Sequence, residues 1–204
     1  MPLREALISA MIEPDSAIVK QCLTKAADPT LVAKNRALSL DERAAILLFT
    51  AEAPPPSASV YTQMNAALRE SREAVEPWRD LIWLLLHALR KLPPAKVPMV
   101  MRGCKKSTAE LGVDLSAQAI FTWHGFSSTT KTADVMSTFL GESGDRTMWH
   151  LQLTEPTARD VSDFSLHPRE DEVRVAPSRA PPVCICASQC SCSHHPPTKK
   201  RAFS

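Results

Sequence analysis

Four polar segments follow one another along the chain and contain the residue types that could carry chemistry. They are Arg102-Gly103, the hydroxyl-rich run 126–130, Ser165, and the acidic segment 168–173. A guanidinium group can grip phosphate oxygens with two parallel charge-assisted hydrogen bonds. A carboxylate can stabilise a sugar that becomes positively charged as its glycosidic bond breaks. These residue types are therefore candidates for binding phosphate groups and for stabilising positive charge.

Each segment also has an ordinary structural interpretation when it is taken alone. An arginine at the end of a strand is usually solvated, and Ser and Thr are common in turns because their hydroxyls satisfy the turn backbone. Glu170 and Glu172 are two residues apart, so they project from one face of a strand, which is often its outward face. The order and spacing of all four segments are more informative than any one of them.

Taken together, the segments resemble the arginine-specific mono-ADP-ribosyltransferase family. That family is defined by an arginine, a Ser-x-Ser-type turn and a Glu-x-Glu pair on three separate strands. This chain has similar residues at 100–103, 123–131 and 165–173. Further upstream, the segment 61–69 is similar to a helical Tyr…Asn…Leu-Arg segment of the family. The match covers roughly residues 39–177, which is most of the chain.

The resemblance implies an NAD+–protein-arginine ADP-ribosyltransferase, in which ADP-ribose moves from NAD+ to a guanidinium group and nicotinamide is released. In that family pattern, Arg102 would bind the pyrophosphate of NAD+, and Gly103 would let the backbone approach the nicotinamide amide. Glu172 would stabilise the charge that develops on the ribose. Ser128 would orient the Glu172 carboxylate through a hydrogen bond.

The same resemblance places the second substrate, a target protein with an acceptor arginine, beside the residues that precede Glu172. Glu170 would engage the incoming guanidinium and help to remove its proton. Phe164 and His167, in the loop 163–167, are candidate contacts with the target protein; the alternative for Phe164 is simple packing. NAD+ enters as a substrate, and neither a metal ion nor a nucleic acid is implied.

The elements that must position these residues differ along the chain. Helical spacing of apolar residues predicts helices within 3–38, from Leu40 to the prolines at 54–56, from Ser57 or Ser59 onward, and over 77–90. Short alternating runs then predict strands at 97–102, 120–124, 149–153, 161–165 and 172–175, with a hydroxyl-rich turn at 127–130 and a helix at 132–140. Helices before strands predict an α+β fold. We expect an N-terminal helical half packed on a mainly antiparallel β core of ADP-ribosyltransferase type, with a split that holds NAD+.

Three segments are predicted along the chain: a helical extension over 1–38, a catalytic domain over 39–179, and a largely disordered, Cys- and Pro-rich basic tail over 180–204. In the family, a further hydrophobic strand follows the glutamate pair. Here only Val183 and Ile185 suit such a strand, so we expect an unpaired sheet edge. The cysteines of the tail favour an oxidisable segment over a zinc site, because their Cys-x-Cys spacing is tighter than usual.

The overall composition is that of an ordinary globular protein, with 44% hydrophobic and 23% charged residues. The net charge of +2 is too small to indicate a nucleic-acid partner. The longest apolar stretch, 81–89, is about half as long as a membrane span, and the first residues do not read as a signal peptide, which favours a cytoplasmic location. Neither the target protein nor the oligomeric state is indicated.

Two other functions stay open at this point. The same site could hydrolyse NAD+, with water in place of the guanidinium. Alternatively, the domain could be non-catalytic and bind protein partners through its helical half, where the apolar stripe 78–89 is the candidate surface.

Overall fold

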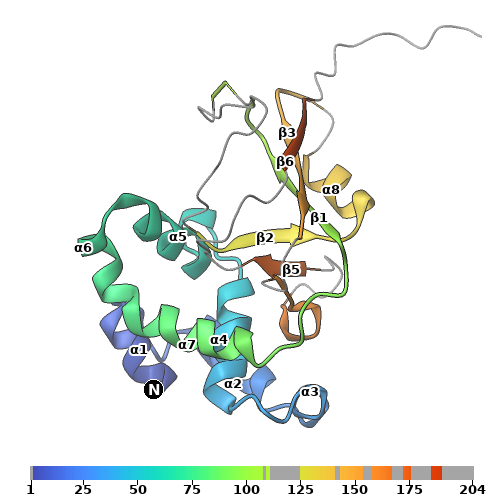
Figure 1. Cartoon of the computed structure of the whole chain (residues 1–204). Helices are drawn as coiled ribbons and strands as arrows, with labels where there is room; N and C mark the ends of the chain where they lie inside the picture. Colours follow the sequence, from blue (N-terminus) through green and yellow to red (C-terminus); the bar gives the residue numbers. More distant parts are fainter. Residues whose placement is uncertain are drawn as a thin grey trace, which may run out of the picture.

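The computed structural model describes residues 2–107, 109–110, 125–140, 143–153, 158–166, 172–175 and 185–189. Most helices come before the strands along the chain, and these helices and the sheet occupy separate parts of the molecule, whereas one later helix lies beside the strands (Figure 1). The strands form one six-stranded sheet in which every pairing is antiparallel. The predicted α+β class is therefore confirmed.

The helical half contains seven helices: α1 Leu3–Ser9, α2 Ala17–Ala26, α3 Pro29–Lys34, α4 Leu40–Thr50, α5 Val60–Glu70, α6 Arg72–Val75 and α7 Arg79–Arg90. Short 3-10 turns at Pro56–Ala58 (η1) and Glu76–Trp78 (η2) precede α5 and α7. Pro29 begins α3, where its missing N–H costs nothing. Within the described residues, no helix has the length and apolar character needed to cross a bilayer.

Helix α4 is the centre of the helical half, because all its residues from Glu42 to Thr50 are buried. A capping box fixes its start: Ser39 Oγ accepts the Glu42 N–H at 3.2 Å, and Glu42 Oε2 accepts the Ser39 N–H at 2.7 Å. A helix buried on all sides needs partners all round. Helices α1, α2 and α7 pack against it, so the helices before Ser39 share one hydrophobic core with those after it.

The strands are β1 Met99–Cys104, β2 Ser127–Thr130, β3 Thr147–Gln152, β4 Ala158–Asp160, β5 Glu172–Val175 and β6 Ile185–Gln189, in the spatial order β4-β5-β2-β1-β3-β6. β1 pairs with β3 over its whole length, from Met99 opposite Gln152 to Cys104 opposite Thr147. Helix α8 (Ala133–Leu140) packs on β1.

The sheet falls into two parts that meet between β1 and β2. Among the described residues, Met101 opposite Thr130 is the one register pair between these strands. In Figure 1, β2 and β5 run across the direction of β1, β3 and β6. We call the pair of Met101 with Thr130 the junction. The sheet divides there; Arg102 and Ser128 lie next to the junction in sequence, and Glu172 lies opposite Thr130.

Two predicted elements differ in the structure. The run 127–130 is the strand β2, not a turn, because its backbone pairs with β5 from Ser127 opposite Val175 to Thr130 opposite Glu172. The Thr129 hydroxyl adds a bond, since its Oγ1 donates to the Val173 carbonyl at 2.7 Å. The predicted strand 161–165 is instead the 3-10 turn η3, Ser162–Phe164. Asp160 Oδ1 causes this turn, since it accepts both the Ser162 N–H at 3.1 Å and the Ser162 hydroxyl at 2.5 Å.

The expectation of a missing strand after the glutamate pair is wrong. Residues 185–189 form β6, which pairs with β3 from Leu151 opposite Ile185 to Thr147 opposite Gln189. The prediction of an unstructured tail is therefore wrong for these five residues. Backbone pairing accounts for the difference, because it depends on no particular side chain and can recruit a segment whose Cys- and Ser-rich composition does not read as a strand. The predicted strand 120–124 lies outside the described residues.

Candidate active site

Three strands bring together Arg102, Ser128 and Glu172. Ser128 Oγ on β2 donates to Glu172 Oε1 on β5 at 2.5 Å. Arg102 Nη1 on β1 donates to the Ser128 carbonyl at 3.0 Å. The register explains the first contact: Ser128 lies opposite Arg174 and Thr130 opposite Glu172, so Ser128 and Glu172 are diagonal neighbours on one face. Three residues predicted to act together are therefore in contact.

Helix α5 supports this cluster with two side chains one turn apart. Tyr61 Oη accepts a hydrogen bond from Arg102 Nη1 at 3.3 Å. Asn65 holds the start of β2, because its Nδ2 donates to the Phe126 carbonyl at 3.1 Å and its Oδ1 accepts the Phe126 N–H at 2.8 Å. A β-carbon at Gly125 would lie 2.5 Å from Asn65 Oδ1, so a larger residue there would displace the Asn65 amide from its bonds to Phe126. These contacts give a physical reason for the Tyr…Asn spacing seen in the sequence.

The Tyr61 hydroxyl lies between two positive charges. Burial raises the pKa of this phenol, but the charges of Arg102 and Arg174, together with the hydrogen bond from Arg102, lower it by more. The pKa of Tyr61 is therefore below its ordinary value of 10.0. The hydroxyl acts as an acceptor that fixes Arg102 at the junction.

Arg174 is part of the cluster and was not predicted from the sequence. Its Nη2 lies 2.5 Å from Glu172 Oε1, and the two side chains are only 5% exposed. Its guanidinium carbon also lies 4.7 Å from the centre of the Phe49 ring and 4.8 Å from that of Tyr61. Strand alternation places it on the same face as Glu172, since residues two apart on a strand share a face, but alternation alone does not show that it is buried.

Gly103 has a packing role on the other side of β1. A β-carbon at this position would lie 2.5 Å from Met136 Sδ and 2.8 Å from Leu140 Cδ2, both on α8. Glycine therefore allows α8 to lie close against β1. The expected contact of the Gly103 backbone with nicotinamide stays a prediction.

The predicted acceptor residues have different outcomes. Phe164 is 3% exposed and belongs to the main hydrophobic cluster, which agrees with packing and not with a surface contact to a target protein. Glu170 and His167 lie outside the described residues.

The last described residues before position 167 are held by the helical half. Lys25 Nζ donates to the Ser165 carbonyl at 3.1 Å, and Thr50 Oγ1 accepts the Leu166 N–H at 3.2 Å. Lys34 Nζ pairs with Asp163 Oδ1 at 3.0 Å. Helices α2, α3 and α4 thus all help to place the segment that leads to Glu172.

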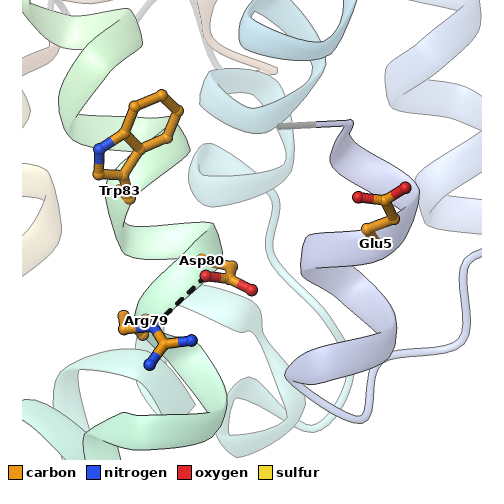
Figure 2. A pocket seen from close by; sticks show the side chains of 4 residues that line it. All are labelled: Glu5, Arg79, Asp80 and Trp83. Carbon is orange, nitrogen blue, oxygen red and sulfur yellow. Dashed lines mark hydrogen bonds and ion pairs between the residues drawn. The ribbon is translucent and has the colours of Figure 1, made fainter.

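A cavity of about 420 Å³ lies elsewhere, between α1 and α7 (Figure 2). Glu5, Arg79, Asp80 and Trp83 line it, and Arg79 Nε pairs with Asp80 Oδ1 at 3.5 Å. None of these residues belongs to the cluster around Glu172. In the part of the chain that the structure describes, no group of three or more His, Cys, Asp or Glu side chains is arranged to hold a metal ion.

Comparison with known proteins identifies the fold. No family model matches the sequence, and no curated protein matches it. Among solved structures, the chain has the fold of an ADP-ribosyltransferase. One such structure is the ADP-ribosyltransferase HopU1 of Pseudomonas syringae pv. tomato, with a TM-score of 0.60 and 19% identity over 78% of this chain and 77% of that one. Another is the type III effector XopAI of Xanthomonas axonopodis pv. citri, with a TM-score of 0.58 and 16% identity over 86% of this chain and 74% of that one.

Proposed function

We propose that this protein is an NAD+–protein-arginine ADP-ribosyltransferase. The observation that carries the proposal is the 2.5 Å hydrogen bond from Ser128 Oγ to Glu172 Oε1, beside an arginine on the neighbouring strand. Residues that are 44 apart in the sequence and match one family motif are thus in direct contact. The fold shared with the ADP-ribosyltransferase HopU1 supports the same function.

In this proposal NAD+ binds across the junction between the two parts of the sheet. Arg102 is held at one nitrogen by Tyr61 and Ser128. A guanidinium fixed in this way is suited to grip the pyrophosphate without a further loss of side-chain entropy. The Gly103 backbone, next to it on β1, would contact the nicotinamide amide.

Glu172 would act on the ribose. The bond between the nicotinamide nitrogen and C1′ of the ribose breaks, and its electron pair leaves with nicotinamide, which becomes neutral. The ribose then carries positive charge, as in glycoside hydrolysis. A carboxylate that is already oriented stabilises that charge as it develops and so lowers the barrier.

Glu170 would determine the acceptor. A bond forms between C1′ and a nitrogen of the target's arginine, and the proton lost from that nitrogen passes to the Glu170 carboxylate. A carboxylate suits this place because the acceptor is a cation. The target protein would bind beside the segment that Lys25 and Thr50 hold in place.

The test is to incubate the purified protein with NAD+ and a guanidino acceptor, and to measure nicotinamide release and acceptor modification separately. We expect Glu172→Gln to reduce both by about 100-fold or more. Glu170→Gln should lose transfer but retain hydrolysis of NAD+. Glu70→Gln serves as the matched control, because Glu70 is exposed at the end of α5 and outside the cluster.

The other results of this experiment distinguish a transferase from an NAD+ glycohydrolase and from a non-catalytic domain. Nicotinamide release without acceptor modification in the unsubstituted protein would indicate an NAD+ glycohydrolase. Binding of NAD+ without any release would indicate a non-catalytic domain. Unchanged arginine modification by Glu172→Gln would contradict the mechanism.

A further inference from the structure

We propose that Arg174 is the positioning residue of this site: it fixes the Glu172 carboxylate so that one oxygen is held by the protein and the other is presented to the ribose. The proposal rests on the proposed function, because it assigns Glu172 to the reacting sugar. It adds a role for a residue that the motif does not contain.

Arg174 is itself fixed by the helical half. Its guanidinium lies over the rings of Phe49 on α4 and Tyr61 on α5, at 4.7 and 4.8 Å from their centres. These two rings also contact each other edge to face, with centroids 5.3 Å apart. Arg174 is only 4% exposed. A guanidinium placed over two packed rings has few other positions, so it is a rigid point of attachment for Glu172.

Ser128 and Arg174 contact the same oxygen of Glu172. Ser128 Oγ and Arg174 Nη2 each lie 2.5 Å from Oε1. Among the described residues, no hydrogen bond reaches Oε2, and the closest contact of Arg174 is with Oε1. Two contacts on one oxygen stop the carboxylate from rotating, and this gives the second oxygen a defined direction. That second oxygen is the one available to a substrate.

This geometry matters because a small displacement of a reacting group has a large effect on rate. A misplacement of about 1 Å can cost about 100-fold. Ser128 alone holds Glu172 through a neutral hydroxyl, whereas Arg174 adds a charged contact within a buried site. Without Arg174, the carboxylate would also be buried with one weak partner, and it would be expected to turn toward water.

An opposite role is to mask Glu172, with the arginine neutralising the carboxylate and lowering activity. The geometry favours positioning, because the contact engages Oε1, which Ser128 already occupies. A masking arginine would be expected to cover both carboxylate oxygens with its two parallel donors. The two roles predict opposite effects of removing the guanidinium.

The experiment measures kcat and KM for NAD+ in nicotinamide release by three variants. Arg174→Met is expected to lower kcat by about 10-fold to 100-fold while KM changes by less than about threefold. Arg174→Lys keeps the positive charge and should recover part of the lost kcat. Circular dichroism and thermal unfolding identify any variant that does not fold, and Arg174→Lys, as the milder change, keeps the test decisive in that event.

Arg159→Met is the matched control. Arg159 lies opposite Arg174 on β4, and its guanidinium donates hydrogen bonds to the carbonyls of Leu89 and Ala158. We expect Arg159→Met to lower the stability of the protein. Its kcat should stay within about twofold of that of the unsubstituted protein.

Three results would overturn the proposal. Activity of Arg174→Met equal to or above that of the unsubstituted protein would indicate masking or no role. An equal loss of kcat in folded Arg159→Met would indicate a general effect on the sheet. Absence of NAD+ binding and cleavage in the unsubstituted protein would remove the proposed function, and the positioning role with it; this result differs from the other two because no variant is needed to see it.

Discussion

Ser128 and Arg174 approach one oxygen atom of Glu172, and this makes the three residues interdependent. Each partner lies 2.5 Å from Oε1, and Glu172 itself is 4% exposed. A buried carboxylate needs several partners to offset its lost hydration. Losing either partner therefore changes what the other can do, and the effects of substitutions at the two positions should not add.

A second buried carboxylate, Glu42, holds α4 to α7. Its Oε1 lies 2.6 Å from Lys91 Nζ and 2.8 Å from His87 Nδ1, and its Oε2 accepts the Ser39 N–H at 2.7 Å. Burial raises the pKa of Glu42, but the hydrogen bonds from Lys91, the Ser39 amide and His87 lower it by more. The resulting pKa is about 2, against an ordinary value of 4.5.

This depressed pKa predicts how stability depends on pH. The native state holds the Glu42 carboxylate ionised, so its contribution is present above pH 4.5 and is lost as the pH falls from 4.5 toward 2. The shift corresponds to about 3 kcal/mol. Glu42→Gln should lower the free energy of unfolding at pH 7 by about this amount and flatten the decline in acid, as measured by urea denaturation across pH. Glu70→Gln should change neither, and an equally steep acid decline in Glu42→Gln would contradict the assignment.

At the scale of residues, the sequence predicts the site residues that belong to a family motif. Arg102, Ser128 and Glu172 follow from their order and spacing. Arg174 was missed because an arginine on a short strand reads as solvated, and only the packing of α4 and α5 over β5 shows that it is buried. Tertiary contacts of this kind have no local signature.

At the scale of elements, the contact between α8 and β1 depends on a glycine. Gly103→Ala would place a β-carbon 2.5 Å from Met136 Sδ. We expect a loss of about 1–3 kcal/mol in the free energy of unfolding, because a packed interface must shift to accept the methyl group. Urea denaturation measures the loss.

Met136→Ala tests the cause of that loss. It removes the nearest atom, so the combined substitution should cost less than the sum of the two single ones. Strict additivity would show that the clash with α8 is not what makes glycine necessary at position 103.

The helices were predicted well because their periodicity, caps and prolines are local features. The strands were predicted less well, since their pairing is not local. The run 127–130 forms a strand because β1 and β5 lie on either side of it. The 3-10 turn at Ser162–Phe164 depends on one acceptor, Asp160 Oδ1, which alternation alone does not reveal.

At the scale of the molecule, β6 closes the outer edge of β3, and its removal can be tested. A chain that ends at Gln189 retains β6, whereas a chain that ends at Val183 lacks it. Losing the strand leaves β3 with unpaired backbone groups, which invite association with other chains. We expect the shorter chain to be less stable by roughly 2 kcal/mol, which would lower Tm by about 4–8 °C, and to aggregate sooner.

Thermal unfolding and light scattering of the two truncated chains measure these effects. Equal midpoints and equal scattering would contradict a structural role for β6. The comparison uses two shortened chains, so the effect of removing residues beyond Gln189 is common to both.

The junction at Met101 and Thr130 also has a thermodynamic consequence. Arg102 lies on one side of it, and Ser128 and Glu172 lie on the other. A dinucleotide that contacts both sides would bind the native state and not chains in which the two parts have separated. Such a ligand couples their opening, so the two parts of the sheet should unfold as one cooperative unit when it is bound. Because β1 and β2 share few backbone pairs, the bound substrate would then help to hold the two parts of the sheet together.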